Sequence, residues 1–262
     1  MSTLKVRRPN ASDNKYSRGV VSFITGSEVY PGAAILTVGG ALAVGVGMVR
    51  FLGTAAVSSQ VLQSYPEVVL KAGENDCLVV GSGHPEALTA DQATALAQAP
   101  SAVIDAAALE YVQFDSTPVA SLLTPHFGEL RKLEARLGLP QSLSPADGDQ
   151  AATRLASATN RFVLVKGSTT YLAGPNQQVR DFGPLSAWLA TAGTGDVLAG
   201  ILGALMAANR DLIENDPADV MQIAELAVRI HSRAADLALA DGPVSAHTLL
   251  TKVGVATLEF LD

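Results

Sequence analysis

Short and almost uninterrupted apolar runs recur along this chain, and each run ends in glycine or polar residues. A strand that is buried on both faces has this pattern, because neither face meets water. Stretches of small apolar residues that favour helices separate the runs, and strands that alternate with helices form a mostly parallel sheet. The sequence therefore predicts a three-layer α/β/α fold, with helices on both faces of one central sheet. The predicted strands comprise residues 19–25, 48–52, 78–80, 102–105, 119–123 and 162–165.

The remaining predicted elements connect these strands or follow them. A helix over residues 144–158 has Ser144 as its cap and Pro145 at its first position, where proline is well tolerated. Residues 171–176 are typical of a hairpin. Other helices are predicted at 33–45, at 85–97, directly after His126, in the apolar run that begins at Val197, and last at 217–240.

Length and composition predict a single domain. A chain of 262 residues can form one large α/β domain or two small ones. Its hydrophobic content of 48% supplies a sizeable core and argues against disorder. Because no linker-like stretch divides the sequence, we predict one domain over residues 1–262, in which residues 1–14 form a flexible lead-in.

Net charge and the length of the apolar runs argue against several classes of partner and location. The net charge of -7 argues against nucleic acid and anionic membranes, since both require a cationic face. The longest apolar runs, such as 197–208, are shorter than the roughly 20 residues of a membrane helix.

Cys77 is the only cysteine, so no intrachain disulfide is possible, and its place before a core strand predicts a buried, inert thiol. Residues 1–10 do not have the pattern of a signal peptide, and we expect a cytoplasmic protein.

Polar residues and glycines gather directly after the predicted strands. The carboxyl ends of parallel strands meet at one edge of the sheet, which is where open α/β sheets bind ligands. Each group alone has a simpler interpretation: Asp105 as a strand-end cap, His126 as a surface histidine, and Lys166 as a solvated charge. Five groups at equivalent positions favour a binding site. They are 26–27, 81–83, Asp105, 124–126 and 166–168.

A glycine turn precedes the longest apolar run. Gly193 and Gly195 flank Thr194, so the backbone can turn tightly and approach a ligand closely. We predict that a helix begins near Gly195, with Asp196 in its first turn. Unpaired N–H groups at such a helix start bind phosphate, and the carboxylate would lie beside that phosphate. The simpler alternative is that Asp196 only caps the helix. The glycine spacing matches neither the dinucleotide fingerprint nor a Walker loop.

Five segments carry more specific motifs. They read Tyr-Pro-Gly-Ala-Ala at 30–34, Leu-Thr-Pro-His-Phe-Gly-Glu-Leu at 123–130, Val-Lys-Gly-Ser at 165–168, Ala-Thr-Ala-Gly-Thr-Gly-Asp-Val-Leu-Ala-Gly at 190–200, and His-Ser-Arg-Ala-Ala-Asp at 231–236. In this order they resemble the ADP-dependent NAD(P)H-hydrate dehydratases, the YjeF C-terminal type of the ribokinase-like superfamily. The resemblance extends from Lys15 to the C-terminus.

The resemblance implies a ribokinase-like fold and a repair reaction. The substrate would be the (S) epimer of NADH or NADPH hydrate, a damaged cofactor with a hydroxyl on its nicotinamide ring. ADP or ATP would phosphorylate this hydroxyl, and elimination of phosphate would restore the reduced cofactor. Phosphate is a far better leaving group than hydroxide, and the ring nitrogen can supply electrons as it departs. The protein would therefore be a lyase.

The resemblance also assigns residues to roles. Asp196 matches the catalytic aspartate, which would accept the proton of the substrate hydroxyl and also contact the substrate. The nucleotide-binding positions are Lys166, Gly167, Ser168, Thr169, Thr170, Gly193, Thr194 and Gly195. The substrate-binding positions are Ala33, Ala34, Gly83, His126 and Asp196. We expect Mg²⁺ to accompany phosphoryl transfer, although the sequence contains no recognisable cluster of metal ligands.

Four positions depart from the family pattern. Ser82 and Pro85 lie where the family reads Gly-Pro-Gly-Leu-Gly, so the last glycine is lost. Ala107 replaces the second aspartate of an Asp-Ala-Asp-Ala-Leu segment. Trp188 lies in a segment that usually reads Gly-Asn-Pro-Gly, and it could pack on adenine or fill the core.

Two other functions remain open from the sequence. A ribokinase-like kinase of a small alcohol, such as a vitamin precursor, would share the anion site but release a stable phosphoester. A catalytically idle nucleotide-binding homologue would explain the departures at Pro85 and Ala107. The resemblance further implies a homo-oligomer, often a tetramer, and a separate epimerase in the same pathway.

Overall fold

A single sheet of eight strands forms the centre of the computed structural model, which describes residues 4–262. Its first six strands in spatial order are parallel, and the last two are antiparallel. The spatial order is β2 (Met48–Phe51), β1 (Val20–Ile24), β3 (Cys77–Val80), β4 (Ser101–Ile104), β5 (Ala120–Leu123), β6 (Phe162–Val165), β7 (Thr170–Ala173) and β8 (Val179–Phe182). The predicted strands and their mostly parallel arrangement are confirmed.

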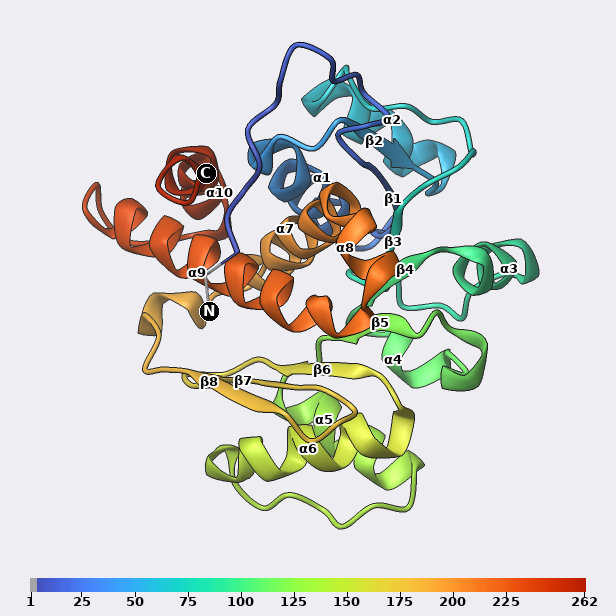
Figure 1. The fold of residues 1–262 in the computed structure, drawn as a ribbon, viewed down its shortest axis with the longest axis vertical. Helices are drawn as coiled ribbons and strands as arrows, with labels where there is room; N and C mark the ends of the chain where they lie inside the picture. Colours follow the sequence, from blue (N-terminus) through green and yellow to red (C-terminus); the bar gives the residue numbers. More distant parts are fainter. Residues whose placement is uncertain (1–3) are drawn as a thin grey trace.

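Helices cover both faces of the sheet (Figure 1). One face carries α1 (Pro31–Val44), α2 (Ala55–Ser64), α7 (Thr194–Ala208), α9 (Val220–Leu239) and α10 (Ala246–Leu258). The other face carries α3 (Ala90–Gln98), α4 (Ala108–Tyr111), α5 (Phe127–Arg136) and α6 (Gly148–Thr159). The short helix α8 (Arg210–Asn215) follows α7. Figure 1 shows α9 on one side of β6–β8 and α5 with α6 on the other.

Alternate residues of each strand enter two separate hydrophobic cores, which explains the uninterrupted apolar runs. In β3, Cys77 and Val79 pack with α1, α7 and α9, whereas Leu78 and Val80 pack with α3 and α5. All four side chains are fully buried. The three-layer α/β/α architecture that the sequence predicts is therefore confirmed.

Cys77 fits the prediction of an inert thiol. It is completely buried, and this burial raises the pKa of its thiol to about 12. A thiol that stays protonated is a poor nucleophile. Among residues 4–262, no helix combines the length and the apolar character that a membrane span requires.

Several helix boundaries differ from the prediction for local reasons. The helix predicted at 85–97 begins only at Ala90, because Thr89 and Gln92 form a capping box there. The helix predicted at 144–158 starts as a 3-10 turn at 145–147, capped by Ser144, before α6 begins. The helix predicted to be last is followed by α10, which Ser245 caps, and α2 was also not predicted.

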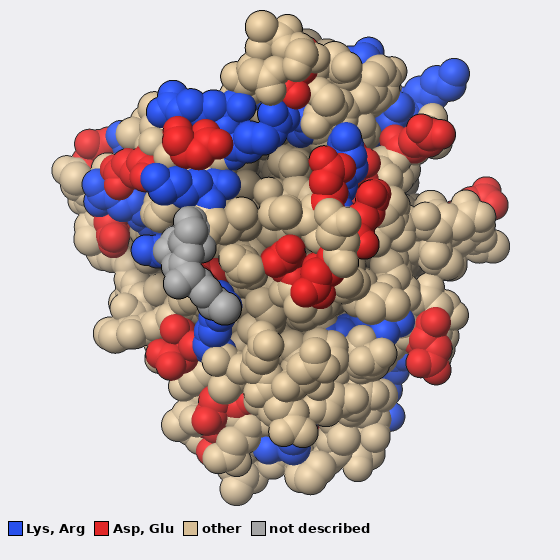
Figure 2. All heavy atoms as spheres, viewed as in Figure 1, with Lys and Arg blue, Asp and Glu red and all other residues tan. Residues whose placement is uncertain are grey.

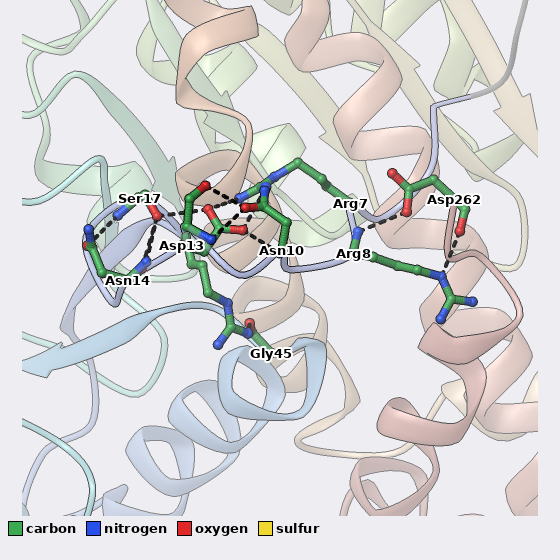
Figure 3. A network of polar contacts seen from close by, with 10 residues as sticks. Arg7, Arg8, Asn10, Asp13, Asn14, Ser17, Gly45 and Asp262 are labelled. Atoms are coloured by element: carbon green, nitrogen blue, oxygen red, sulfur yellow. Dashed lines mark hydrogen bonds and ion pairs between the residues drawn. The ribbon is translucent and has the colours of Figure 1, made fainter.

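The lead-in is attached to the C-terminal end of the chain (Figure 3). Val6 pairs with Leu261, and the backbone N–H of Arg8 donates to the Asp262 carboxylate at 2.8 Å. Arg7 forms two hydrogen bonds with Asp13 at 2.9 and 3.0 Å. Residues 4–14 contain no helix, but these contacts fix their path, which the prediction of a flexible lead-in did not anticipate. Residues 1–3 of that prediction lie outside the described part of the chain.

Glycines allow α1 and α7 to pack with their backbones in contact. A Cβ atom on Gly200 would lie 2.0 Å from the carbonyl oxygen of Thr37, and one on Gly40 would lie 2.5 Å from that of Val197. Backbone atoms in two packed helices cannot move aside as a flexible side chain can. The two helices, whose first turns both reach the carboxyl edge of the sheet, are therefore held at a fixed spacing.

This packing predicts a large stability difference between two glycine substitutions. Gly200→Ala should lower the free energy of unfolding by about 1–3 kcal/mol, because overpacking outweighs the better helix propensity of alanine. Gly254→Ala on α10 is the matched control, since its Cβ would meet only the Ala43 carbonyl oxygen at 3.6 Å. The control should be neutral or stabilising by up to about 1 kcal/mol. Urea denaturation measures both, and equal effects would contradict the proposed close packing.

Candidate active site

Backbone hydrogen bonds link the carboxyl ends of neighbouring strands. The N–H of Gly26 donates to the Ser82 carbonyl, and the N–H of Asp105 donates to the carbonyl of Val80. Lys166 bridges to the segment after β5, where its N–H donates to the Pro125 carbonyl at 2.8 Å. The five polar groups that follow the strands therefore meet at one edge of the sheet, as predicted.

The glycine turn leaves two backbone donors unpaired at the start of α7. Gly193 has a φ of +90°, and the helix begins at Thr194, one residue before the predicted start. The N–H of Thr194 donates to Thr191 and that of Val197 donates to Gly193. Among the described residues, the N–H groups of Gly195 and Asp196 have no such acceptor. Two free donors at a helix N-terminus are suited to bind an anion.

Asp105 accepts three hydrogen bonds at the end of β4. Its Oδ1 accepts from Lys166 Nζ at 2.6 Å and from Thr124 Oγ1 at 2.7 Å. Its Oδ2 accepts from Ser82 Oγ at 2.7 Å. Asp105, Ser82 and Thr124 are almost completely buried, so this cluster satisfies the carboxylate without water. The simpler interpretation of Lys166 as a solvated charge is therefore wrong, because its ammonium group is paired with Asp105.

The cluster keeps both members of its ion pair charged. Burial alone would raise the pKa of Asp105, but the charge of Lys166 and the three hydrogen bonds hold this pKa below its ordinary value. Burial likewise opposes the charge of Lys166, but the carboxylates of Asp105, Glu129 and Asp196 together raise its pKa. The site therefore contains a fixed ammonium ion next to the free backbone donors.

Asp196 lies in the first turn of α7 and differs from an ordinary aspartate. Burial, together with the negative charge of Asp105, raises the pKa of Asp196 to about 6, although the charge of Lys166 opposes this. A carboxylate with this pKa is a stronger base than an exposed one and is still mostly ionised at neutral pH. This perturbation at a helix start distinguishes Asp196 from a simple cap.

His126 caps α5 and has one nitrogen left for a ligand. Its Nδ1 accepts hydrogen bonds from the N–H groups of Gly128 and Glu129, at 3.0 and 3.3 Å. These contacts assign the neutral tautomer that carries its proton on Nε2. The Nε2 atom lies 3.4 Å from the Glu129 carboxylate, and the side chain is 60% exposed. Neutral His126 can therefore donate a hydrogen bond from Nε2 but cannot accept a proton there.

His231 on α9 supports the start of α7. It is buried, and its Nε2 lies 2.8 Å from the carbonyl oxygen of Thr194. Burial lowers the pKa of His231 to about 4, so it donates this hydrogen bond as a neutral imidazole at physiological pH. The sequence placed His231 in a family motif but gave it no role, because its contact with Thr194 joins residues far apart in the chain.

A pocket of about 560 Å³ opens between the end of β6, the start of α7 and α9. Its lining contains seven of the predicted site residues, namely His126, Lys166, Gly167, Ser168, Thr170, Thr194 and Gly195. Leu185, Leu189, Leu198 and Val228 add apolar surface that the sequence analysis did not identify. An apolar pocket with a few converging polar groups is typical of a small-molecule site.

Some predicted nucleotide-binding residues do not line this pocket. Thr169 lines a separate depression with Tyr171 and Asp181. Gly193 lies against Leu36 of α1 instead, where a Cβ would come within 2.6 Å of the leucine side chain. Gly193 therefore shapes the turn, and its φ of +90° explains why glycine is needed. Asp196 also lies outside the pocket lining, one residue after Gly195.

The predicted substrate positions Ala33, Ala34 and Gly83 form a second corner, at the first turn of α1. A Cβ on Gly83 would lie 2.4 Å from that of Ala33, and a Cβ on Gly26 would lie 2.6 Å from that of Ala34. Ala34 is fully buried, so it shapes this corner without presenting exposed surface to a ligand. Small residues here let three backbone segments converge.

The departures from the family pattern have different structural consequences. Ser82 donates to Asp105 and is fully buried. Trp188 lies in a 3-10 turn and is 43% exposed, so it does not fill the core. It is also not part of the lining of the 560 Å³ pocket. Ala107 precedes α4 without a side-chain cap.

Charge is mixed on the surface, and residues 4–262 offer no preformed metal cage. Figure 2 shows basic and acidic side chains next to one another on one face. No group of three His, Cys, Asp or Glu side chains within the described residues could hold a metal ion.

A family model described as NAD(P)H-hydrate dehydratase matches residues 21–254. The chain belongs to the NAD(P)H-hydrate dehydratase family. It is 35% identical to the bifunctional NAD(P)H-hydrate repair enzyme Nnr of Mycobacterium leprae, over 95% of this chain and 53% of that protein. It is 29% identical to the ADP-dependent (S)-NAD(P)H-hydrate dehydratase of Xanthomonas campestris pv. campestris, over 78% of both chains.

A solved structure of this dehydratase family has the same fold. The ADP/ATP-dependent NAD(P)H-hydrate dehydratase of Bacillus subtilis, co-crystallised with ATP and Mg²⁺, aligns with a TM-score of 0.82. The alignment covers 98% of this chain and 95% of that one, at 23% identity. The ribokinase-like fold is thus confirmed. The chain spans about half the length of the Nnr proteins that it matches.

Ionised Asp196 should reduce the stability of this dehydratase-family protein. Its folded-state pKa of about 6 exceeds the ordinary value of 3.8, so burial penalises the ionised form above pH 6, and the penalty is lost below 3.8. We expect Asp196→Asn to raise the free energy of unfolding by about 1–2 kcal/mol at pH 8, a value discounted for partial exposure. The gain should be smaller at pH 4.

Urea denaturation at the two pH values measures this effect. Asp181→Asn is the control, because Asp181 is exposed on the edge strand β8. This control should change stability little at either pH. A gain for Asp196→Asn that is the same at pH 8 and pH 4 would rule out the ionisation penalty.

Proposed function

We propose that this protein restores NADH and NADPH from the (S) epimers of their hydrates, using ADP or ATP as phosphoryl donor. The observation that carries the proposal is the start of α7. There, two free backbone N–H groups and the basic Asp196 carboxylate share one helix turn, and the Lys166 ammonium ion lies beside Gly195 in space. This combination suits transfer of a phosphoryl group to an alcohol.

Asp196 would act as the general base. As the substrate hydroxyl attacks the terminal phosphorus of ADP, its proton passes to the Asp196 carboxylate and the bond to AMP breaks. The N–H groups of Gly195 and Asp196 would stabilise the charge on the transferred group. The new phosphoester then loses phosphate with its bonding electron pair, the ring nitrogen supplies electrons, and loss of a proton from the adjacent carbon restores the double bond.

The nucleotide would occupy the 560 Å³ pocket. Lys166 lies at its phosphate end, since a Cβ on Gly195 would be 3.6 Å from the Lys166 Nζ. Apolar residues such as Val228 and Leu185 line the rest of the pocket and suit a base or ribose. Thr169 and Gly193 would act by shaping the backbone, because they do not line this space. Mg²⁺ would enter with the nucleotide and neutralise phosphate charge.

The hydrated ring would lie next to this pocket, between His126, which lines it, and the corner formed by Ala33, Ala34 and Gly83. The tautomer of His126 supports a role in binding, because its Nε2–H can donate to a carbonyl such as the ring carboxamide. That same tautomer has no free lone pair on Nε2, so neutral His126 is not a base for the elimination.

The other expectations of the sequence analysis rest on the family resemblance. We propose a homo-oligomer, with a tetramer as the expected form, and a cytoplasmic location. A separate epimerase would convert the (R) hydrate into the form used here. The relatives named Nnr are described as bifunctional, which is compatible with a second activity in those longer proteins.

The direct test is recovery of reduced nicotinamide absorbance from chemically hydrated NADH. We expect recovery only when ADP or ATP is present, together with one AMP and one phosphate for each NADH formed from ADP. A stable phosphoester of the hydrate, or phosphorylation only of an unrelated alcohol, would identify the kinase alternative. Nucleotide binding without turnover of either kind would identify an idle homologue.

Asp196→Asn tests the base assignment. Turnover should fall by about 10³-fold or more, whereas nucleotide affinity should stay within about tenfold, because the carboxylate acts in the transition state. In the unsubstituted protein, activity should fall as the pH drops below about 6, where Asp196 becomes protonated. Isothermal titration with ADP and a pH–rate profile provide the two measurements. Substantial turnover by the variant would refute the role of Asp196.

A further inference from the structure

Lys166 is surrounded by three carboxylates but pairs with only one of them. The negative charges of Asp105, Glu129 and Asp196 all raise the pKa of Lys166. The direct contact is with Asp105, whose Oδ1 lies 2.6 Å from Nζ. The structure therefore assigns the ammonium ion to the carboxylate at the end of β4, and not to the one at the start of α7.

Contacts other than the ion pair with Lys166 fix the orientation of the Asp105 side chain. Ser82 donates to one carboxylate oxygen and Thr124 to the other, so the carboxylate cannot rotate without losing a buried hydrogen bond. Its backbone is equally confined, since a Cβ on Gly81 would come within 1.9 Å of the Asp105 carbonyl oxygen. The next residue, Ala106, has a left-handed φ of +48°, which is costly for a residue with a Cβ.

This arrangement has a consequence for Asp196. An ammonium ion that paired directly with Asp196 would stabilise its ionised form and make it a weaker base. Lys166 instead stays beside Gly195, close enough to attract a phosphate, and leaves the Asp196 carboxylate without an ion-pair partner among the described residues.

We propose that Asp105 is a positioning residue: oriented by Ser82 and Thr124, it holds Lys166 at the phosphate end of the pocket and keeps it from pairing with Asp196. The inference deepens the proposed function and rests on it, because a free Asp196 matters only if this carboxylate accepts a proton. Asp105 itself need not touch the nucleotide or the substrate.

Other titratable groups also surround this cluster. Glu129 and His126 face it from α5, and His231 faces it from α9. Burial, reinforced by Asp105, raises the pKa of Glu129 although Lys166 opposes this. A test must therefore follow the titration of Asp196 itself, and not only the activity.

The first experiment changes the orientation of Asp105 without changing any charge. In a Ser82→Ala, Thr124→Val double variant, Asp105 loses both hydroxyl donors, so its carboxylate can rotate and no longer holds Lys166 away from Asp196. We expect the pKa of Asp196 to fall by about half a pH unit or more. Carbon-13 NMR of carboxyl-labelled aspartate measures it, with the Asp196 signal assigned by its absence in Asp196→Asn. An unchanged titration would overturn the proposal.

The second experiment removes the carboxylate. Asp105→Asn should lower the pKa of Asp196 by about one pH unit and reduce kcat by about tenfold or more, with the acid limb of the pH–rate profile moving to lower pH. A crystal structure of this variant should place Lys166 Nζ within hydrogen-bond distance of Asp196. If Lys166 instead keeps its position, Asp105 does not hold it there.

Glu134→Gln is the matched control. Glu134 is completely buried and pairs with Arg154 at 3.0 Å, so its loss removes a buried carboxylate of another ion pair. It should lower stability but leave the titration of Asp196 and the pH–rate profile unchanged. If the control shifts both as much as Asp105→Asn does, the effect is a general one of stability, and the proposal fails.

The NMR titration does not require turnover, so the two proposals can fail separately. Absence of dehydratase activity in the unsubstituted protein would refute the proposed function, while the Asp196 titration would still decide whether Asp105 controls Lys166. Conversely, an active protein whose Asp196 titrates identically in all variants would retain the function and refute the role of Asp105.

Discussion

A largely buried ammonium ion needs a carboxylate partner, and the partner of Lys166 lies 61 residues earlier in the chain. Only the parallel sheet brings the two together, because the carboxyl ends of β4 and β6 finish at the same edge. β5 lies between them and contributes Thr124, which binds the same carboxylate oxygen as the lysine. The local order of the site thus depends on the global arrangement of the strands.

The sequence predicted the architecture well because the fold depends on patterns that one segment carries by itself. A run such as Phe162–Val165 must be buried on both faces, and the groups that follow such strands must then share an edge. The glycine turn was likewise located from its local sequence, whereas the seven predicted residues that line one pocket were named as binding residues from the family resemblance. The roles of these residues in binding and catalysis remain predictions.

Features that depend on contacts between distant segments could not be predicted. Lys166 could equally have been a solvated charge, and only the folded structure shows that it is the largely buried partner of Asp105. The contact between His231 and Thr194 links α9 to α7 and has no local signal. Two roles were open for Trp188, packing on adenine or filling the core, and its exposed position excludes the second. Helix α10 was missed, although the Ser245 cap is a signal that could have revealed it.

The backbone contact between α1 and α7 has a consequence for how such a protein can diverge. The start of α1 carries the corner formed by Ala33, Ala34 and Gly83, and the start of α7 carries the glycine turn with its two free N–H groups. Main-chain atoms meet where Gly40 and Gly200 lie, so this separation does not depend on side-chain volume. Residues lining either half can therefore be exchanged during evolution without altering the distance between the two helix starts.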